Sequence, residues 1–249
     1  MTNKIMLVHF GRSGSTVIAK MLAKHTKIAW FEEIVTLQEQ KGAKTTEWQV
    51  GDYVSLIDNL PQPKRHVGYE VKPINFYKNP NVKIEDVIEH YHAAGDTTFI
   101  FLQRHNTLRR YISAVKASKL SLYHVKADDG PKPEKKAITL DLKDLHDYDS
   151  ASKADTLVDL LRKAKTEEQR LMNFFEEKGI DMLHLTYEEH IEQNPLDAYN
   201  IICSYMMLGI EQQEITLRKT SAGIRNDIEN FDEVKAALAG SEFEWMVEE

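Results

Sequence analysis

Short apolar runs recur along the chain, and the first of them opens a strand, turn and helix pattern. Ile5–Val8 is a continuous apolar run that ends shortly before Gly11. Such a run is typical of a strand buried on both faces of a parallel sheet. From Ser15 onward the apolar residues recur at three- and four-residue spacing, which predicts an amphipathic helix. These apolar positions are Val17, Ile18, Met21 and Leu22.

The same alternation of apolar runs and helical stretches continues through the rest of the chain. Three further runs predict strands, namely Val67–Lys72, Thr98–Leu102 and Met182–Leu185. Helices are predicted from Thr107 onward, over Ala154–Lys178 and over Pro195–Leu208. Strands separated by helices favour a parallel sheet. We therefore predict an α/β fold, a three-layer domain with a central parallel sheet flanked by helices.

One polar segment interrupts this pattern and bears on the number of domains. A chain of 249 residues is long enough for one large domain or two small ones, on a prior of roughly 150 residues per domain. The clearest polar break is Lys126–Lys136, yet the strands on its two sides are too few for independent sheets. We predict a single domain over 1–249, with a polar excursion at about 124–150.

Composition and charge narrow the class of protein. Hydrophobic residues make up 42% and charged residues 29%, as in a folded globular protein. The net charge of −7 disfavours binding to nucleic acid or to an anionic membrane surface, so an anion needs a local site. We expect no transmembrane segment, no secretory signal and a cytoplasmic location. The single cysteine, Cys203, lies in an apolar run and is expected to be a buried structural thiol.

The turn after the first predicted strand, His9–Thr16, is rich in glycine and hydroxyl residues. Gly11 and Gly14 permit unusual backbone angles, and the amides at the start of the following helix favour an anion. This is a P-loop-like anion-binding turn in its placement. It departs from G-x-x-x-x-G-K-[ST], since His9 and Ser15 stand where Gly and Lys belong, and from G-x-G-x-x-G. The alternative is a tight turn with Ser or Thr capping the helix.

Four blocks in order resemble the sulfotransferases that use 3′-phosphoadenosine 5′-phosphosulfate (PAPS). The first is Gly11–Thr16, and the second is Leu102–Ser113. The third is Leu185–Glu189 followed by Asn194-Pro195, and the fourth is Lys219-Thr220 with Ile228–Val234. The resemblance is to the bacterial-type and carbohydrate sulfotransferases, and it covers most of the chain. It implies a donor site at the carboxyl ends of two strands.

The resemblance also implies a role for each block. The residues expected to hold the 5′ group are Gly11, Arg12, Ser13, Gly14, Ser15 and Thr16. Arg104 and Ser113 would hold the 3′-phosphate, Tyr187 would lie near the adenine, and Lys219 would close over the 3′-phosphate. Arg104 precedes Ser113 by nine positions, whereas many members space the pair by eight, which places His105 at the matching position.

Each of these roles has a plainer alternative. Arg104, Arg109 and Arg110 could form a solvated helix face with acidic neighbours, the commoner fate of surface arginine. Tyr187 could only pack and hydrogen-bond at the edge of the core. Lys219 could be solvated.

The residues Trp30–Ile34 carry the predicted general base. Related carbohydrate sulfotransferases use a Glu or His, and Glu33 is the expected base here, with Arg12 stabilising charge. Trp30 and Phe31 would desolvate a neighbouring carboxylate and raise its pKa. Glu32 and His105 are the alternatives for the base. Lys72 would reach the transferred group or cap the edge of the sheet.

The resulting hypothesis is an enzyme that transfers a sulfuryl group from PAPS to a hydroxyl acceptor by in-line displacement. Adenosine 3′,5′-bisphosphate is then the product, and the acceptor is a carbohydrate, a lipid or another small molecule. The sequence shows no convincing cluster of metal ligands, so no metal is expected. A kinase or nucleotide hydrolase with a degenerate phosphate loop is the alternative, and a non-catalytic nucleotide-binding module is a third class.

Overall fold

A computed structural model describes residues 3–120, 136–146, 153–217, 221 and 223–248. Most of the predicted polar excursion, and Lys219, lie outside these residues. The chain divides into two compact units, each built from two segments. The first unit consists of Met1–Gln103 with Arg170–Glu214, and the second of Arg104–Gln169 with Ile215–Glu249. The two units are described separately below.

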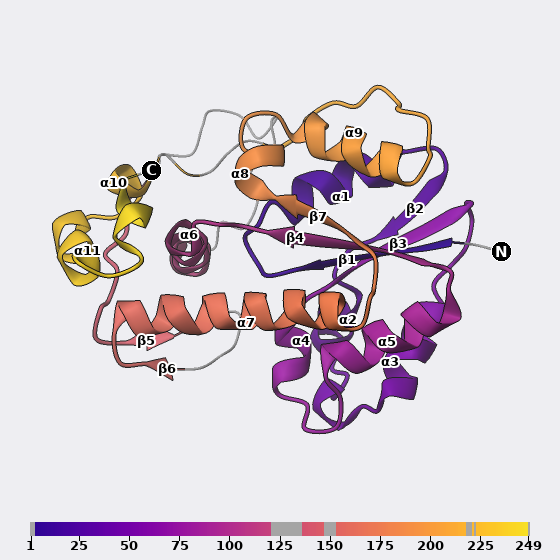
Figure 1. Cartoon of the computed structure of the whole chain (residues 1–249), viewed down its shortest axis with the longest axis horizontal. Coiled ribbons are helices and arrows are strands. Elements are labelled where there is room, and N and C mark those ends of the chain that lie inside the picture. The colour runs from indigo at the N-terminus through magenta and orange to yellow at the C-terminus, as the bar shows by residue number, and fades with distance from the viewer. Residues whose placement is uncertain (1–2, 121–135, 147–152, 218–220, 222, 249) are drawn as a thin grey trace. The chain divides into compact units, whose positions relative to one another are not determined.

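The first unit contains a five-stranded sheet in which every pair of neighbouring strands is parallel (Figure 1). Its strands are β1 (Asn3–His9), β2 (Ile28–Phe31), β3 (His66–Val71), β4 (Thr97–Gln103) and β7 (Met182–Thr186). Their order across the sheet is β2-β3-β1-β4-β7. The predicted α/β fold with a central parallel sheet is confirmed. The edge strand β2 is an addition that the sequence analysis did not predict.

The register of β1 with its two neighbours fixes which loops start side by side. Val8 pairs with Val71 of β3, and His9 pairs with Leu102 of β4. The chain therefore leaves β1, β3 and β4 at the same edge of the sheet. The direction in which strands are added also reverses at β1. Strands β2 and β3 lie on one side of β1, and the later strands β4 and β7 lie on the other. Open α/β sheets bind ligands at such a switch point.

Helices cover both faces of this sheet. One face carries α1 (Ser15–Lys24) and α9 (Pro195–Tyr205), and the other carries α3 (Val50–Asp58) and α5 (Ile84–Ala94) (Figure 1). The remaining helices of the unit are α2 (Ile34–Gln40), the 3₁₀ helix Thr45–Glu47, α4 (Ile74–Tyr77), α8 (Tyr187–His190) and the end of α7 (Leu157–Glu177). The predicted helices from Ser15 and over Pro195–Leu208 correspond to α1 and α9.

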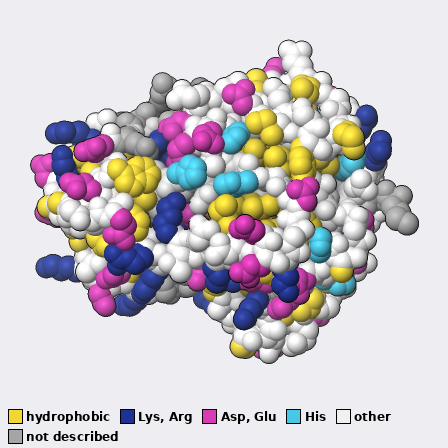
Figure 2. All heavy atoms as spheres, viewed as in Figure 1, with side chains coloured by type: hydrophobic (Ala, Val, Ile, Leu, Met, Phe, Trp, Pro, Cys, Tyr) yellow, Lys and Arg dark blue, Asp and Glu magenta, His cyan; other side chains and the backbone are white. Residues whose placement is uncertain are grey.

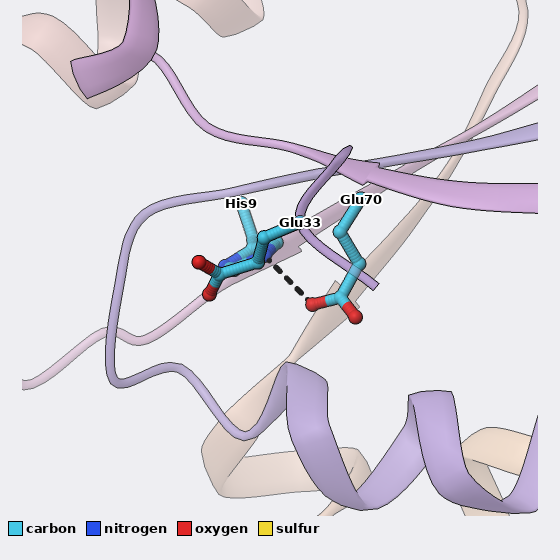
Figure 3. A group of neighbouring side chains, drawn as sticks. All are labelled: His9, Glu33 and Glu70. Atoms are coloured by element: carbon cyan, nitrogen blue, oxygen red, sulfur yellow. Dashed lines mark ion pairs between the residues drawn. The ribbon is translucent and has the colours of Figure 1, made fainter. Parts of the chain in front are cut away.

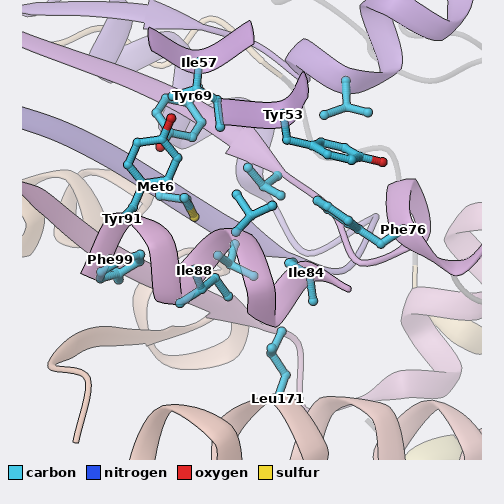
Figure 4. Close-up of a cluster of buried hydrophobic side chains, with 14 of the residues drawn as sticks. Met6, Tyr53, Ile57, Tyr69, Phe76, Ile84, Ile88, Tyr91, Phe99 and Leu171 are labelled. Atoms are coloured by element: carbon cyan, nitrogen blue, oxygen red, sulfur yellow. The ribbon is translucent and has the colours of Figure 1, made fainter. Parts of the chain in front are cut away.

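Alternate residues of β1 point into two separate cores. Met6 and Val8 pack with the side of α5, and Ile5 and Leu7 pack with the side of α1, as the two-residue period of a strand requires. Figure 4 shows the first of these cores, where Tyr69 and Tyr91 lie beside Met6. The continuous apolar run of β1 is thus explained by burial on both faces. Cys203 belongs to the second core and is fully buried, which confirms its predicted placement.

The second unit is mostly helical. It contains α6 (Thr107–Leu120), the first part of α7, α10 (Ile224–Asp227), α11 (Phe231–Leu238) and the 3₁₀ helix Glu244–Val247. A two-stranded antiparallel ladder joins β5 (Leu145–His146) and β6 (Lys153–Ala154). The core of the unit includes Leu108, Leu161 and Val234. Beside it, Arg110 and Glu168 form a buried ion pair between α6 and α7.

Two observations concern the surface charge and the hydropathy of the helices. On the face seen in Figure 2, Lys and Arg side chains are interspersed with Asp and Glu. Among the described residues, no helix combines the length and the hydropathy that crossing a membrane requires.

Candidate functional site

The loop between β1 and α1 has the backbone geometry of a tight turn into a helix. Arg12 has φ 63° and Gly14 has φ 91°, both in the left-handed region. Gly14 directly precedes the first residue of α1, Ser15. The Ser13 hydroxyl donates a hydrogen bond of 2.8 Å to the carbonyl of Phe10, which holds the loop closed. Because the first amides of a helix have no partner within the helix, they are available to a ligand or to capping groups.

Gly14 also lies against the residues that follow β7. A Cβ atom built on Gly14 would lie 3.0 Å from Cδ2 of Tyr187 and 3.1 Å from Cδ1 of Ile191. Both the positive φ and this close approach favour glycine at this position. The structure therefore brings together two of the predicted blocks, Gly11–Thr16 and the segment that contains Tyr187. Tyr187 is half-buried and is the first residue of α8.

A second group of charges lies where β2 and β3 end. Glu33 precedes α2, and Lys72 follows β3 directly. The Nζ atom of Lys72 lies 2.5 Å from Oε2 of Glu33, in a half-buried ion pair. Glu32 is exposed. Of the two adjacent glutamates, only Glu33 is therefore held in place by a cation of the sheet edge in the described structure.

Behind Glu33 lies a buried ion pair that the sequence analysis missed. The Nε2 atom of His9 is 3.1 Å from Oε2 of Glu70, and both side chains are almost fully buried (Figure 3). Burial raises the pKa of the Glu70 carboxyl, but His9, Trp30 and Ser15 together hold that pKa below its ordinary value. The only signal in the sequence was a titratable residue near the end of each of two apolar runs.

The indole of Trp30 packs on β3. A Cβ atom built on Gly68 would lie 2.2 Å from Cε3 of Trp30, so the ring rests directly on the Gly68 backbone. Its Nε1 atom donates toward Oε1 of Glu70 at 3.4 Å. The carboxylate that Trp30 contacts is thus Glu70, whereas the contact recorded for the expected base Glu33 is with Lys72.

The second predicted anion block belongs to the second unit from Arg104 onward. Arg104 immediately follows β4 and is 5% exposed, and Ser113 is half-buried on α6. Arg109 and Arg110 are also buried, with Arg110 paired to Glu168. The alternative of a solvated helix face for these three arginines is therefore wrong. His105 is half-buried, and Lys219 lies outside the described residues.

Within the first unit, a glycine loop, an aromatic ring and two ion pairs gather at one edge of a parallel sheet. The members are Gly11–Thr16, Tyr187, the pair Glu33–Lys72 and the pair His9–Glu70. Chemically, this set offers backbone amides and a cation for an anion, and a carboxylate that is able to accept a proton. Such an arrangement suits the transfer of an anionic group.

Comparison with known proteins assigns the family. No curated protein matches the chain. Among solved structures, the crystal structure of a sulfotransferase from Alicyclobacillus acidocaldarius is similar, with 13% identity, 95% of this chain and 90% of that chain covered, and a TM-score of 0.46. The model of the Stf0 sulphotransferase family matches residues 75–231. Because this match spans more than half of the sequence, the chain belongs to the Stf0 sulphotransferase family.

Proposed function

We propose that the chain transfers a sulfuryl group from PAPS to a hydroxyl acceptor. One observation carries this proposal beyond the family assignment. His9 of β1 pairs with Leu102 of β4, so the two segments predicted to bind anions start from neighbouring strand ends. A donor with phosphate groups at both its 5′ and 3′ positions needs two anion sites near each other, and adjacent strand ends supply their starting points.

The residues of the first loop fit the 5′ end of such a donor. The left-handed conformations at Arg12 and Gly14 turn the chain at the start of α1, and the amino end of a helix favours a phosphate or sulfate. Tyr187, packed against Gly14, is suited to contact the adenine side of the same ligand. Arg104 and Ser113 are proposed to hold the 3′-phosphate, and Lys219 is proposed to close over it.

Glu33 is proposed as the general base. When bound, the donor supplies the sulfuryl group, whose bond to the phosphate oxygen breaks as the acceptor oxygen bonds to sulfur, leaving adenosine 3′,5′-bisphosphate. Glu33 takes the proton of the acceptor hydroxyl. Lys72, in contact with Glu33, keeps the carboxylate in position, and Arg12 disperses negative charge on the transferred group.

Three features favour Glu33 over its rivals. Glu32 is exposed, and it is not among the residues grouped with His9 and Glu70. His105 belongs to the segment proposed to hold the 3′-phosphate, so a binding or structural part suits it better. Glu33, in contrast, lies beside Lys72, His9 and Glu70, where β1, β2 and β3 end.

Ligand-induced shifts in thermal unfolding test the donor. Adenosine 3′,5′-bisphosphate should raise the unfolding temperature more than 5′-AMP or ATP does, because only it presents both phosphates to the two sites. Ser113→Ala should reduce that preference by roughly tenfold in affinity, the loss of one hydrogen bond to a charged group. Ser118→Ala, at an exposed position of the same helix, is the matched control. Equal responses to all three nucleotides would argue against a 3′-phosphate site.

A transfer assay with labelled donor distinguishes a sulfotransferase from a kinase or nucleotide hydrolase. A kinase or nucleotide hydrolase needs Mg²⁺ to neutralise the phosphates of its substrate. The proposed reaction needs only the cations and amides of the chain, so its rate should persist when Mg²⁺ is chelated. A set of carbohydrate, lipid and small alcohol acceptors in the same assay identifies the acceptor class. A non-catalytic nucleotide-binding module would bind the bisphosphate and transfer nothing.

A further inference from the structure

Three side chains with metal-binding atoms converge where β1 and β3 end. His9 is the last residue of β1, Glu70 is the last but one of β3, and Glu33 comes from the segment between β2 and α2. One nitrogen or oxygen atom from each lies within 4.8 Å of those from the other two (Figure 3). They come from distant parts of the sequence, and the sheet alone brings them together.

The surroundings of the His9 ring determine which nitrogen faces the carboxylates. Its Nδ1 atom lies 3.1 Å from the carbonyl oxygen of Phe10, which can only accept, so Nδ1 carries a proton. Nε2 is left to face Glu70, at 3.1 Å from Oε2, but without the angles of a hydrogen bond. His9 is 1% exposed and Glu70 is 3% exposed. A nitrogen and a carboxylate oxygen buried this close together need either a proton or a metal ion between them.

Each of the three side chains also has a partner outside the group. The Nδ1–H group of His9 donates to a backbone carbonyl, the usual outer contact of a histidine that ligates a metal. Trp30 and Ser15 hydrogen-bond to Glu70, and Lys72 contacts Oε2 of Glu33. The contacts of His9 and Glu70 fix the orientation of their donor atoms before any ion binds, as in a preorganised metal site.

We propose that His9, Glu33 and Glu70 bind one divalent transition metal ion, with Zn²⁺ as the physiological candidate. One imidazole nitrogen with two carboxylate oxygens suits Zn²⁺ or Co²⁺, whereas Mg²⁺ and Ca²⁺ prefer oxygen ligands alone. Three protein ligands leave room for water at the remaining positions. The charge of Lys72 opposes the ion, so the metal competes with Lys72 for Glu33.

The consequence for activity rests on the proposed function. A metal ion that holds the Glu33 carboxylate prevents it from accepting the proton of the acceptor hydroxyl. Zn²⁺ should therefore inhibit sulfuryl transfer, and its removal by a chelator should restore the rate. The metal in this proposal regulates the site and takes no part in the transfer step.

Cobalt absorption spectroscopy on the full untagged chain tests the site without using the reaction. We expect one Co²⁺ per chain, with the visible absorption of a four- or five-coordinate ion that Zn²⁺ displaces. Glu33→Gln, which keeps the shape of the side chain at a half-exposed position, should weaken binding by roughly 100-fold. His9→Ala should abolish the signal, with its folding checked by circular dichroism. His146→Ala removes a different histidine paired with a carboxylate and is the matched control.

Two results would overturn the site. One is the absence of a bound Co²⁺ spectrum at millimolar metal, and the other is binding that Glu33→Gln leaves unchanged or that His146→Ala weakens equally. Inhibition by Zn²⁺ is measured separately in the transfer assay. If the chain transfers no sulfuryl group, the proposed function fails, whereas the Co²⁺ titration still decides whether the three residues bind metal.

Discussion

The pairing of Glu33 with Lys72 places a carboxylate where it is able to act as a base. The contact of 2.5 Å holds Glu33 at the sheet edge, while about a third of its side chain stays open to solvent. A base must be fixed in direction and still reachable by the acceptor. Glu33 meets both conditions, and Glu32, one residue earlier and exposed, meets only the second.

Glu33→Gln should therefore lower kcat by roughly 10² to 10⁴, the usual contribution of general base catalysis, while the binding of adenosine 3′,5′-bisphosphate stays close to that of the wild type. Glu32→Gln should leave both nearly unchanged, and it provides the control for charge at the same surface. The rates come from steady-state transfer assays, and the affinities from calorimetry. Comparable losses in the two variants would remove Glu33 from the role of base.

Two other buried titratable side chains of the first unit, Cys203 and Tyr91, have structural rather than catalytic roles. Burial raises the pKa of the Cys203 thiol, which keeps the thiol protonated and a poor nucleophile. Burial likewise raises the pKa of Tyr91, whose hydroxyl donates to Asp58 at 3.0 Å. Neither group lies with the charged residues at the carboxyl edge, so neither belongs to the candidate site.

At the scale of the elements, the edge strand β2 depends on one glycine of β3. The Trp30 ring lies on Gly68 so closely that any Cβ there would overlap it. Gly68→Ala should displace Trp30 from Glu70 and destabilise the protein by about 1–3 kcal/mol, as for an overpacked core. Gly51→Ala, in a helix with open space around it, should be neutral or stabilising by up to about 1 kcal/mol.

Denaturant unfolding measures both variants, and a double-mutant cycle identifies the cause. If the clash is with the indole, the smaller side chain of a Trp30→Leu background leaves room for the added methyl group, so Gly68→Ala should cost less there. An equal cost in both backgrounds would mean that the backbone of β3, rather than Trp30, excludes the side chain.

How far the sequence predicts these elements depends on burial. Strands β1, β3, β4 and β7 are marked by apolar runs, which burial on both faces requires. The edge strand β2 is only four residues long, and its aromatic half adjoins two glutamates, so it lacks the long apolar run that marks the other strands. The pair His9–Glu70 escaped prediction because the pairing of β1 with β3 creates it, and residue spacing does not encode that pairing.

At the scale of the whole molecule, the chain is threaded through two compact units, and neither unit is a continuous segment. The segments alternate along the chain. The first unit is completed by Arg170–Glu214, and the second unit is completed by Ile215–Glu249. The predicted donor residues are divided accordingly. Gly11–Thr16 and Tyr187 belong to the first unit, and Arg104 and Ser113 to the second. Donor binding on the proposed model therefore depends on the folding of both units.

A charge placed in the core of the second unit tests this dependence in the full chain. Val234 on α11 is fully buried among the residues that pack with α6. Val234→Asp should therefore unfold the second unit selectively. The reason is that an unpaired buried carboxylate costs several kcal/mol. Hydrogen exchange should then show lost protection in α6 and retained protection in β1 and β4. Ala236→Asp, at an exposed position of the same helix, should change neither. Loss of protection throughout the chain would show that the two units fold as one, and retained bisphosphate affinity in Val234→Asp would contradict the role proposed for Arg104 and Ser113.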